Sequence, residues 1–209
     1  MIEPRDHIGI SILTPELEGR RLTAEEFEGA AGQDGYRFEL VNGVLHVSPA
    51  PNLHAKKIAL AIYRRLFEHR DRLGERVFGM VLIEPRVLIR TEPENTTNPE
   101  PDVAAYDTPA EPFENSFEGL SPVLVVEVVS PDSADKDYRR NLQLYGSVDG
   151  IIEYWIVDPT SDAARPSLTV HKRAEGHLPF ECVDIDPGGT YEPERWPELK
   201  IELRRIAVE

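Results

Sequence analysis

The chain of 209 residues contains a single cysteine, Cys182. One cysteine cannot form an internal disulfide, and it cannot supply a cysteine-based zinc site. A long hydrophobic run is also lacking, because the apolar stretch 122–126 is broken by Glu127 and falls far short of the ~20 residues that a spanning helix needs. The first residues show no basic start followed by an apolar block. We therefore expect no secretory signal, no membrane partner and a cytoplasmic location.

Positive charge is scarce, with 23 Lys and Arg against 38 Asp and Glu, so the formal net charge is −15. A protein of this charge repels nucleic acid on average. The charges are unevenly distributed, since residues 51–90 carry nine basic and four acidic side chains, whereas residues 91–122 carry eight acids and no Lys or Arg. This pattern is compatible with a polarised molecule, and equally with acidic loops that only keep the protein in solution.

Hydrophobic residues make up 40% of the chain, which is enough for a substantial core, and no internal repeat or low-complexity linker divides it. We expect one domain over residues 1–209, with a β-rich C-terminal extension at about 166–209. Strand-forming residues at 36–41 and 44–47 flank Asn42-Gly43, a pair typical of a tight hairpin.

Helix signals occur at two places before the middle of the chain. Thr23 and Glu26 have the spacing of a capping box. Asn52 can cap a helix that continues, with apolar residues at three- and four-residue steps, to about Leu73. Nearly continuous β-branched and apolar residues at 123–129 and 151–157 indicate buried strands, with a helix between them that reaches about Tyr145. The sum predicts an α/β or α+β domain with a mixed central sheet flanked by helices.

Three acidic residues interrupt or begin these strands. Glu127 lies inside Val-Val-Glu-Val-Val, where a buried carboxylate is unfavourable unless it is paired, protonated or bound to a metal. The alternative is a strand-end residue that reaches solvent or a structural arginine. Asp102 follows Pro101, and a Pro-Asp pair is also common in turns. Glu39 could equally be a surface residue of its strand. Two carboxylates on adjacent strands can hold one or two hard divalent cations.

Over about residues 20–175 the sequence resembles the restriction-endonuclease-like family of the PD-(D/E)xK nuclease superfamily. The matching segments occur in the expected order and at plausible spacing. They are Tyr36 to Gly43, His54, Pro101-Asp102-Val103, Val126 to Ser133, Asp137, Tyr145, and Glu153 to Pro159.

The resemblance implies a restriction-endonuclease-like fold, with a mixed sheet between helices and an active site at one sheet edge. It implies Asp102 and Glu127 as catalytic acids and Mg²⁺ ligands, with Glu39 contributing a third carboxylate and Mn²⁺ able to substitute. The implied reaction is metal-dependent hydrolysis of a DNA phosphodiester, in which a lysine orients the attacking water and stabilises the phosphorane.

The expected lysine is missing. Val129 stands two residues after the second acid, and Asn141 stands where this family usually carries its lysine. Lys136 and Arg140 are the nearest replacements. In an α-helix, however, Lys136 would point about 140° and Arg140 about 100° away from Asn141. Neither is a natural replacement unless the start of the helix is irregular.

The basic helix offers a surface for DNA. Lys57 and Arg64 could contact phosphates, together with Arg140, and His54 could approach the metal site as the family match suggests. The alternative for the basic residues is a solvated helix face. A lone histidine is more often a cap or a hydrogen-bond partner.

Three functional hypotheses follow from these residues. The first is a Mg²⁺-dependent endonuclease acting on DNA, which the three retained acids favour. The second is a catalytically silent nuclease fold that binds DNA or a protein, which the missing lysine favours. A paired-carboxylate glycoside hydrolase is the third, but no aromatic sugar platform accompanies the acids. A homodimer is expected, because two active sites would suit cleavage of a duplex.

Overall fold

The computed structural model describes residues 9–74, 77–92, 94–108, 119–131 and 134–208. The chain divides into two compact units. Unit 1 contains Met1–Ala50 and Arg90–Asn98, and unit 2 contains Pro51–Ile89 and Pro99–Glu209. Each unit is described by itself, and the expectation of a single domain over the whole chain stays a prediction.

Unit 1 is built around the expected hairpin. Asn42 and Gly43 have φ angles of 51° and 72°, which the tight turn between β3 and β4 requires. The backbone also approaches closely at Gly43, because a Cβ there would collide with the Glu94 carbonyl oxygen. The capping box is confirmed: Thr23 Oγ1 accepts from Glu26 N, and Glu26 Oε2 accepts from Thr23 N at 2.8 Å. The elements are β1 (Ile12–Leu13), the 3₁₀ helix η1 (Pro15–Leu17), α1 (Ala24–Glu28), β2 (Ala31–Gly32), β3 (Tyr36–Val41) and β4 (Val44–Pro49).

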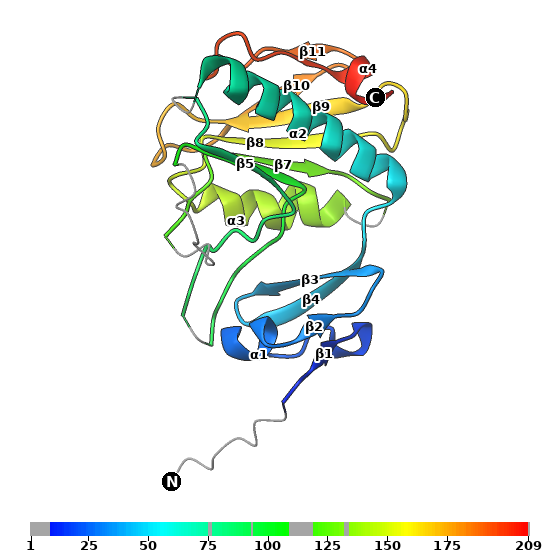
Figure 1. The fold of residues 1–209 in the computed structure, drawn as a ribbon, viewed down its shortest axis with the longest axis vertical. Helices are drawn as coiled ribbons and strands as arrows, with labels where there is room; N and C mark the ends of the chain where they lie inside the picture. The colour runs from blue at the N-terminus through cyan, green and yellow to red at the C-terminus, as the bar shows by residue number, and fades with distance from the viewer. Residues whose placement is uncertain (1–8, 75–76, 93, 109–118, 132–133, 209) are drawn as a thin grey trace. The chain divides into compact units, whose positions relative to one another are not determined.

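Unit 2 is built on a six-stranded mixed sheet, so the predicted fold class is confirmed (Figure 1). The strand order is β10-β9-β8-β7-β6-β5, and only the β7–β8 pair is parallel. The strands are β5 (Met80–Ile83), β6 (Val103–Tyr106), β7 (Leu124–Val128), β8 (Glu153–Asp158), β9 (Ser167–Lys172) and β10 (Glu181–Ile185).

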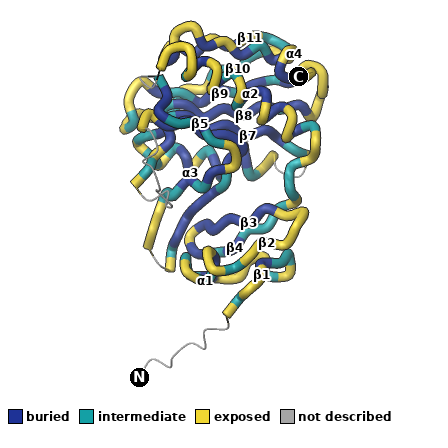
Figure 2. Tube along the Cα trace, in the orientation of Figure 1, coloured by how far each residue is buried: buried dark blue, intermediate teal, exposed yellow. Residues whose placement is uncertain are grey.

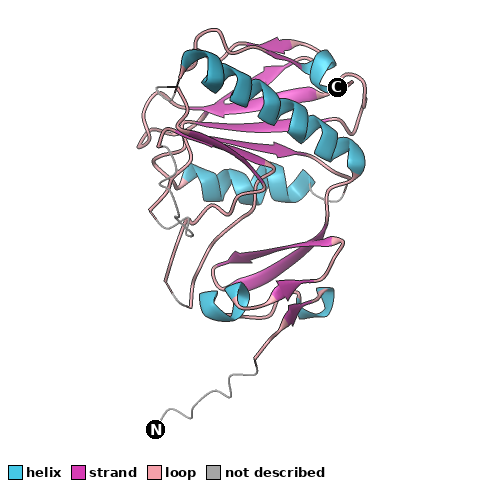
Figure 3. Ribbon diagram, in the orientation of Figure 1, coloured by secondary structure: helices cyan, strands magenta, loops and turns pink. Residues whose placement is uncertain are grey.

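Helices cover both faces of this sheet (Figure 3). On one face α2 (Leu53–Leu73) packs with α4 (Leu203–Ile206) and with β11 (Thr190–Tyr191) and β12 (Ile201–Glu202), which form a two-stranded sheet. The other face carries the π-helix η2 (Lys136–Asn141) and α3 (Leu142–Gly146). Figure 2 shows that the central strands between these layers are buried. Asn52 caps α2 as expected, since its Oδ1 accepts from Ala55 N at 2.9 Å.

The structure differs from the sequence expectations in two places. The C-terminal strands β9 and β10 belong to the central sheet, because β9 pairs with β8 along its whole length. The helix that follows β7 is not a regular α-helix, since its first turns form η2. Among the described residues, no helix combines the length and the apolar content that crossing a bilayer requires.

An acidic residue is buried at the start of β8. Glu153 is 2% exposed, and its Oε2 accepts hydrogen bonds from Trp155 Nε1 at 2.6 Å and Tyr191 OH at 3.0 Å. The carboxylate therefore ties β11 to the central sheet. Burial raises the pKa of Glu153 above its ordinary value of 4.5; the two hydrogen bonds and Lys172 oppose this rise, and Glu194 adds to it.

The raised pKa predicts a pH-dependent contribution of Glu153 to stability. The native state holds a proton on this carboxyl more tightly than the unfolded chain does. Its stabilisation is therefore fully present below pH 4.5 and is lost as the pH rises through the folded-state pKa. In urea unfolding from about pH 4 to about pH 8, the wild type should lose stability relative to Glu153→Gln. Glu175→Gln, on the surface, serves as the control, and a difference independent of pH would contradict the interpretation.

Candidate active site

The register of two strands brings two of the predicted acids together. Val103 of β6 pairs with Val126 of β7 in antiparallel register, and one further step places Asp102 opposite Glu127. Directly opposed residues of antiparallel strands point to the same face of a sheet. Both acids are buried, with exposed fractions of 4% and 1%. The register places the two residues at the same end of neighbouring strands, and their meeting around one cation stays a prediction.

Hydrogen bonds fix the orientation of both carboxylates. The backbone N–H of Val128 donates to Asp102 Oδ2 at 2.7 Å. Glu127 Oε1 accepts from Asn141 Nδ2 at 2.8 Å and from Tyr145 OH at 3.1 Å. The alternative of a solvent-reaching strand end is excluded for Glu127, because its side chain turns towards η2 and α3. Such bonds to an ionised carboxylate are shorter and stronger than neutral ones.

The π-helix changes where the candidate lysine lies. Hydrogen bonding from residue i to i+5 brings residues five apart onto nearly the same side, and such segments often occur at functional sites. Lys136 and Asn141 are five apart and begin and end η2. The divergence of about 140° expected from α-helical geometry is therefore wrong for this segment. Lys136 Nζ lies 3.7 Å from Oδ1 of the buried Asp137.

Arg140 is also closer to the site than α-helical geometry suggests. Its Nε donates to Asn141 Oδ1 at 3.1 Å, while Nδ2 of the same amide donates to Glu127. Asn141, with no exposed surface, therefore links the guanidinium to the carboxylate. The expected angle of about 100° between Arg140 and Asn141 describes only the directions in which the side chains leave the helix, and not how far the arginine side chain reaches.

The tyrosine of β8 shows that these charges converge. Tyr154 is fully buried and donates its hydroxyl to the Asp137 carbonyl at 2.8 Å. Burial raises the pKa of Tyr154 well above its ordinary value, and the negative charges of Glu127, Asp137 and Asp102 raise it further. The charge of Arg140 acts in the opposite direction. Three carboxylates and one guanidinium thus act on a single hydroxyl.

The N-terminal end of α2 reaches the same end of the sheet as the acids. Glu84 N donates to Asp102 O at 3.0 Å, and Lys56 Nζ lies 3.8 Å from Glu84 Oε1. However, α2 packs on the opposite face of the sheet from η2. Lys56 and Lys57 are therefore near the end of the sheet that carries the acids, whereas Arg64 lies about 10 Å further along the helix.

Three predicted DNA-binding residues of α2 have local environments that leave their roles open. His54 Nε2 lies 3.2 Å from the Ala163 carbonyl oxygen, and the side chains of Lys57 and Arg64 are exposed. Contact of these three residues and Arg140 with DNA stays a prediction.

Glu39 lies in unit 1, on β3, where it pairs with His46 and is 2% exposed. Its burial argues against the alternative of a surface residue. Its expected place as a third ligand beside Asp102 and Glu127 stays a prediction. Among the described residues, no group of three or more His, Cys, Asp and Glu side chains lies close enough together to hold a metal ion.

The pair in unit 2 nevertheless offers the donors that a hard divalent cation prefers. Both side chains are carboxylates, both are removed from water, and they stand at the same end of neighbouring strands. Two buried negative charges side by side are unfavourable, and a cation between them would relieve the repulsion. Asp102 and Glu127 are therefore the residues that would hold a hard divalent cation.

Sequence reasoning assigned no role to Tyr145, although its hydroxyl supports Glu127. The spacing could have indicated this role. Tyr145 lies four residues after Asn141, which directly precedes α3, so the two side chains lie on the same side of the helix. The buried Asp137 was recognised only as a landmark of the resemblance.

The hydrogen bonds to Glu127 predict a stability cost on truncation. Asn141→Ala removes a buried donor from a buried carboxylate, and should lower the free energy of unfolding by about 1–3 kcal/mol in urea denaturation. Gln143→Ala, two residues further on and exposed, should change it by less than about 0.5 kcal/mol. Equal losses in the two variants would show that the Asn141 amide does not support Glu127.

Comparisons with known proteins identify the family and a protein of similar fold. A crystal structure of a protein from Anabaena variabilis ATCC 29413, described as a putative nuclease belonging to DUF820, is similar in fold with a TM-score of 0.63. The similarity covers 90% of this chain and 98% of that one at 16% sequence identity. No curated protein sequence matches. The Uma2 family model, described as "Putative restriction endonuclease", matches residues 24–195, and the chain belongs to this family.

Proposed function

We propose that this protein is a Mg²⁺-dependent endonuclease that hydrolyses phosphodiester bonds of DNA. The observation that carries the proposal is the burial of two carboxylates at one end of neighbouring strands, Asp102 directly before β6 and Glu127 in β7. The family and the fold are those of nucleases, which supports the reaction class. When bound, Mg²⁺ would lower the pKa of the attacking water and place positive charge beside the phosphate.

The chain's own residues hold this centre in a fixed geometry. Val128 N orients Asp102, and the side chains of Asn141 and Tyr145 orient Glu127. These donors come from rigid elements, a strand and a helix, which limits the displacement of the carboxylates. The residues therefore prepare a site for the ion before it binds.

In this protein, two residues of η2, Lys136 and Arg140, can provide the positive charge that a lysine gives in related enzymes. Lys136 shares the side of Asn141 in the π-helix, and Arg140 is held to Asn141 by a hydrogen bond. Either cation can attract the phosphate and stabilise its developing charge. Arg140 cannot accept a proton near neutral pH, so a role in orienting the water falls to Lys136.

One observation favours the second function, a catalytically silent module that binds DNA or a protein. In the lysine position the neutral amide of Asn141 is fully buried and donates directly to Glu127. A buried amide fixes the carboxylate but supplies no charge to a phosphate. In this case Lys57, Arg64 and His54 would still contact DNA, and the protein would bind without cutting.

A homodimer is proposed for the active enzyme. Each copy supplies one acid pair, and cleavage of both strands of a duplex needs two. The symmetric arrangement would present one pair to each strand.

Plasmid cleavage separates the two functions. We expect the protein to nick or linearise supercoiled plasmid with Mg²⁺ or Mn²⁺. Asp102→Ala and Glu127→Gln should reduce the rate by at least about 100-fold, because each removes a ligand charge. Glu175→Gln, which alters an exposed acid, should cut as the wild type does.

The outcomes are distinguishable. Absence of cleavage by the wild type, with DNA binding that weakens as salt rises, would support the silent module. Cleavage by purified Asp102→Ala at the wild-type rate would contradict the assignment of the site.

The source of the positive charge can be tested by moving it. Lys136→Met should lower cleavage by at least about tenfold, and Asn141→Lys, which restores the family lysine, should rescue it in the double variant. Lys57→Met is the matched control, and should weaken DNA binding without changing the rate at saturating DNA. Full activity of Lys136→Met would exclude Lys136 from the mechanism.

A further inference from the structure

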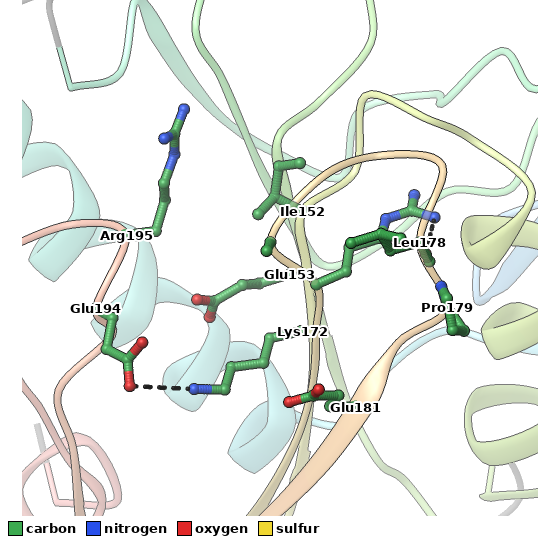
Figure 4. A pocket seen from close by; sticks show the side chains of 10 residues that line it. Ile152, Glu153, Lys172, Leu178, Pro179, Glu181, Glu194 and Arg195 are labelled. Atoms are coloured by element: carbon green, nitrogen blue, oxygen red, sulfur yellow. Dashed lines mark hydrogen bonds and ion pairs between the residues drawn. The ribbon is translucent and has the colours of Figure 1, made fainter.

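The two margins of the central sheet differ in chemistry. Near the β10 margin a cavity of about 500 Å³ opens beside Glu153 (Figure 4), and Glu side chains and Lys or Arg side chains line it in equal number. The strand β10 itself carries Glu181 and Asp184, both exposed. Charged side chains on an edge strand oppose its pairing with another strand. This margin therefore favours a ligand of neither sign and is protected against a further strand.

The opposite margin of the sheet, formed by β5, is apolar (Figure 1). From Met80 to Ile83 the strand consists of apolar residues, with no charged side chain and no proline. The side chain of Val81 anchors the strand in the core beneath α2, whereas Leu82 is half-buried and Ile83 is 42% exposed. An apolar edge strand that lacks such protection is a template for pairing with another strand.

The hydrogen bonds between β5 and β6 show which backbone groups of the edge point outward. Glu84 N donates to Asp102 O, which stands opposite it when the register is extended by one step, so these two form a hydrogen-bonded pair. Such pairs alternate along antiparallel strands, so Leu82 also turns its backbone groups towards β6. The N–H and C=O groups of Val81 and Ile83 therefore point away from the sheet. Among the described residues, no hydrogen bond outside this ladder involves them.

A second copy of β5 fits this edge in one antiparallel register. Val81 and Ile83 of the second copy would exchange both of their outward backbone hydrogen bonds, and the twofold axis repeats the exchange. Leu82 then stands opposite its own counterpart, and Met80 stands opposite Glu84. No like charges oppose each other in this register, so the strand is complementary to itself.

We propose that β5 is the interface of a homodimer, in which two copies of the chain join their central sheets by antiparallel pairing about Leu82. This inference rests on the homodimer of the proposed function and names the surface that forms it. The twofold axis runs through the joined sheet, so the acid pairs of both copies are directed to the same face. Strand spacing and rise put the Cα atoms of the two Asp102 residues about 20 Å apart. Cleavage of both strands of one duplex requires two sites on one side.

Disulfide trapping on the full chain tests the register. In a Cys182→Ser background, Leu82→Cys should form an intermolecular disulfide under mild oxidation, seen by non-reducing electrophoresis. The two opposed positions form a non-hydrogen-bonded pair, whose Cα atoms lie about 4.5 Å apart, within the range of a disulfide. Met80→Cys in the same background is the matched control, and should stay monomeric on the gel because its two copies lie about 14 Å apart.

Sedimentation equilibrium tests the dimer itself. Ile83→Pro removes an outward N–H without removing a donor of the β5–β6 ladder, and should raise the dissociation constant of the dimer at least about tenfold. Leu53→Pro is the matched control. It also replaces an exposed apolar residue by proline, at the first position of α2 where proline is tolerated, and should dimerise as the wild type does.

The results separate failure of this interface from failure of the proposed function. A dimeric wild type in which Leu82→Cys does not cross-link, or in which Met80→Cys cross-links equally well, would overturn the interface and leave the homodimer. An unchanged dissociation constant in folded Ile83→Pro would do the same. A wild type that is monomeric at all concentrations would overturn both. Because trapping needs no loss of backbone donors, it decides the question even if Ile83→Pro fails to fold. Absence of cleavage by a dimeric wild type would contradict only the catalytic proposal.

Discussion

Two carboxylates that are buried side by side impose the constraint on which the rest of unit 2 depends. Asp102 directly precedes β6 and Glu127 lies in β7, at the same end of these neighbouring strands, and each is almost fully removed from water. Like charges in such a place are tolerated only when donors or a cation compensate them. The backbone of β7, the amide of Asn141 and the hydroxyl of Tyr145 supply donors. A divalent cation completes the compensation in the function we propose.

The π-helix adapts the chain to this constraint. Asn141, the last residue of the π-helix, donates to Glu127, and Arg140 donates to the amide oxygen of Asn141. A helix of regular pitch would separate Lys136 from Asn141, and the wider turn brings them to one side. The same physics recurs at the opposite end of the sheet, where Glu153 is buried with donors on one oxygen only. One end carries the two buried carboxylates that we propose as metal ligands, whereas the other has the single carboxylate of Glu153.

The sequence predicted those features that depend on local chemistry. Asn42-Gly43 specifies its turn, and Thr23 and Asn52 cap helices, because each acts on backbone groups within a few residues. Glu127 was recognisable because a charge in a β-branched strand has few tolerable environments. Its position on a strand adjacent to the one that begins after Asp102 suggested the pair, and the family resemblance then implied both acids as metal ligands.

The remaining features depend on tertiary contacts that local patterns do not contain. The hydrogen bond from Asn141 to Glu127 joins residues 14 apart across a strand and a helix. The π-helix has no sequence signature comparable to a cap or a turn. Glu153, like Glu127, is an acid within an apolar strand, yet Tyr191, which donates to its carboxylate, lies 38 residues away.

The central claim is that Asp102 and Glu127 together hold one divalent cation. Electron paramagnetic resonance of Mn²⁺ measures this directly, because bound and free ions give different signals. The account predicts one bound Mn²⁺ per chain, displaced by excess Mg²⁺ and lost in Asp102→Asn, which keeps the size of the side chain but removes its charge. Mn²⁺ binding of equal strength in the wild type and Asp102→Asn, or no binding by the folded wild type, would contradict it.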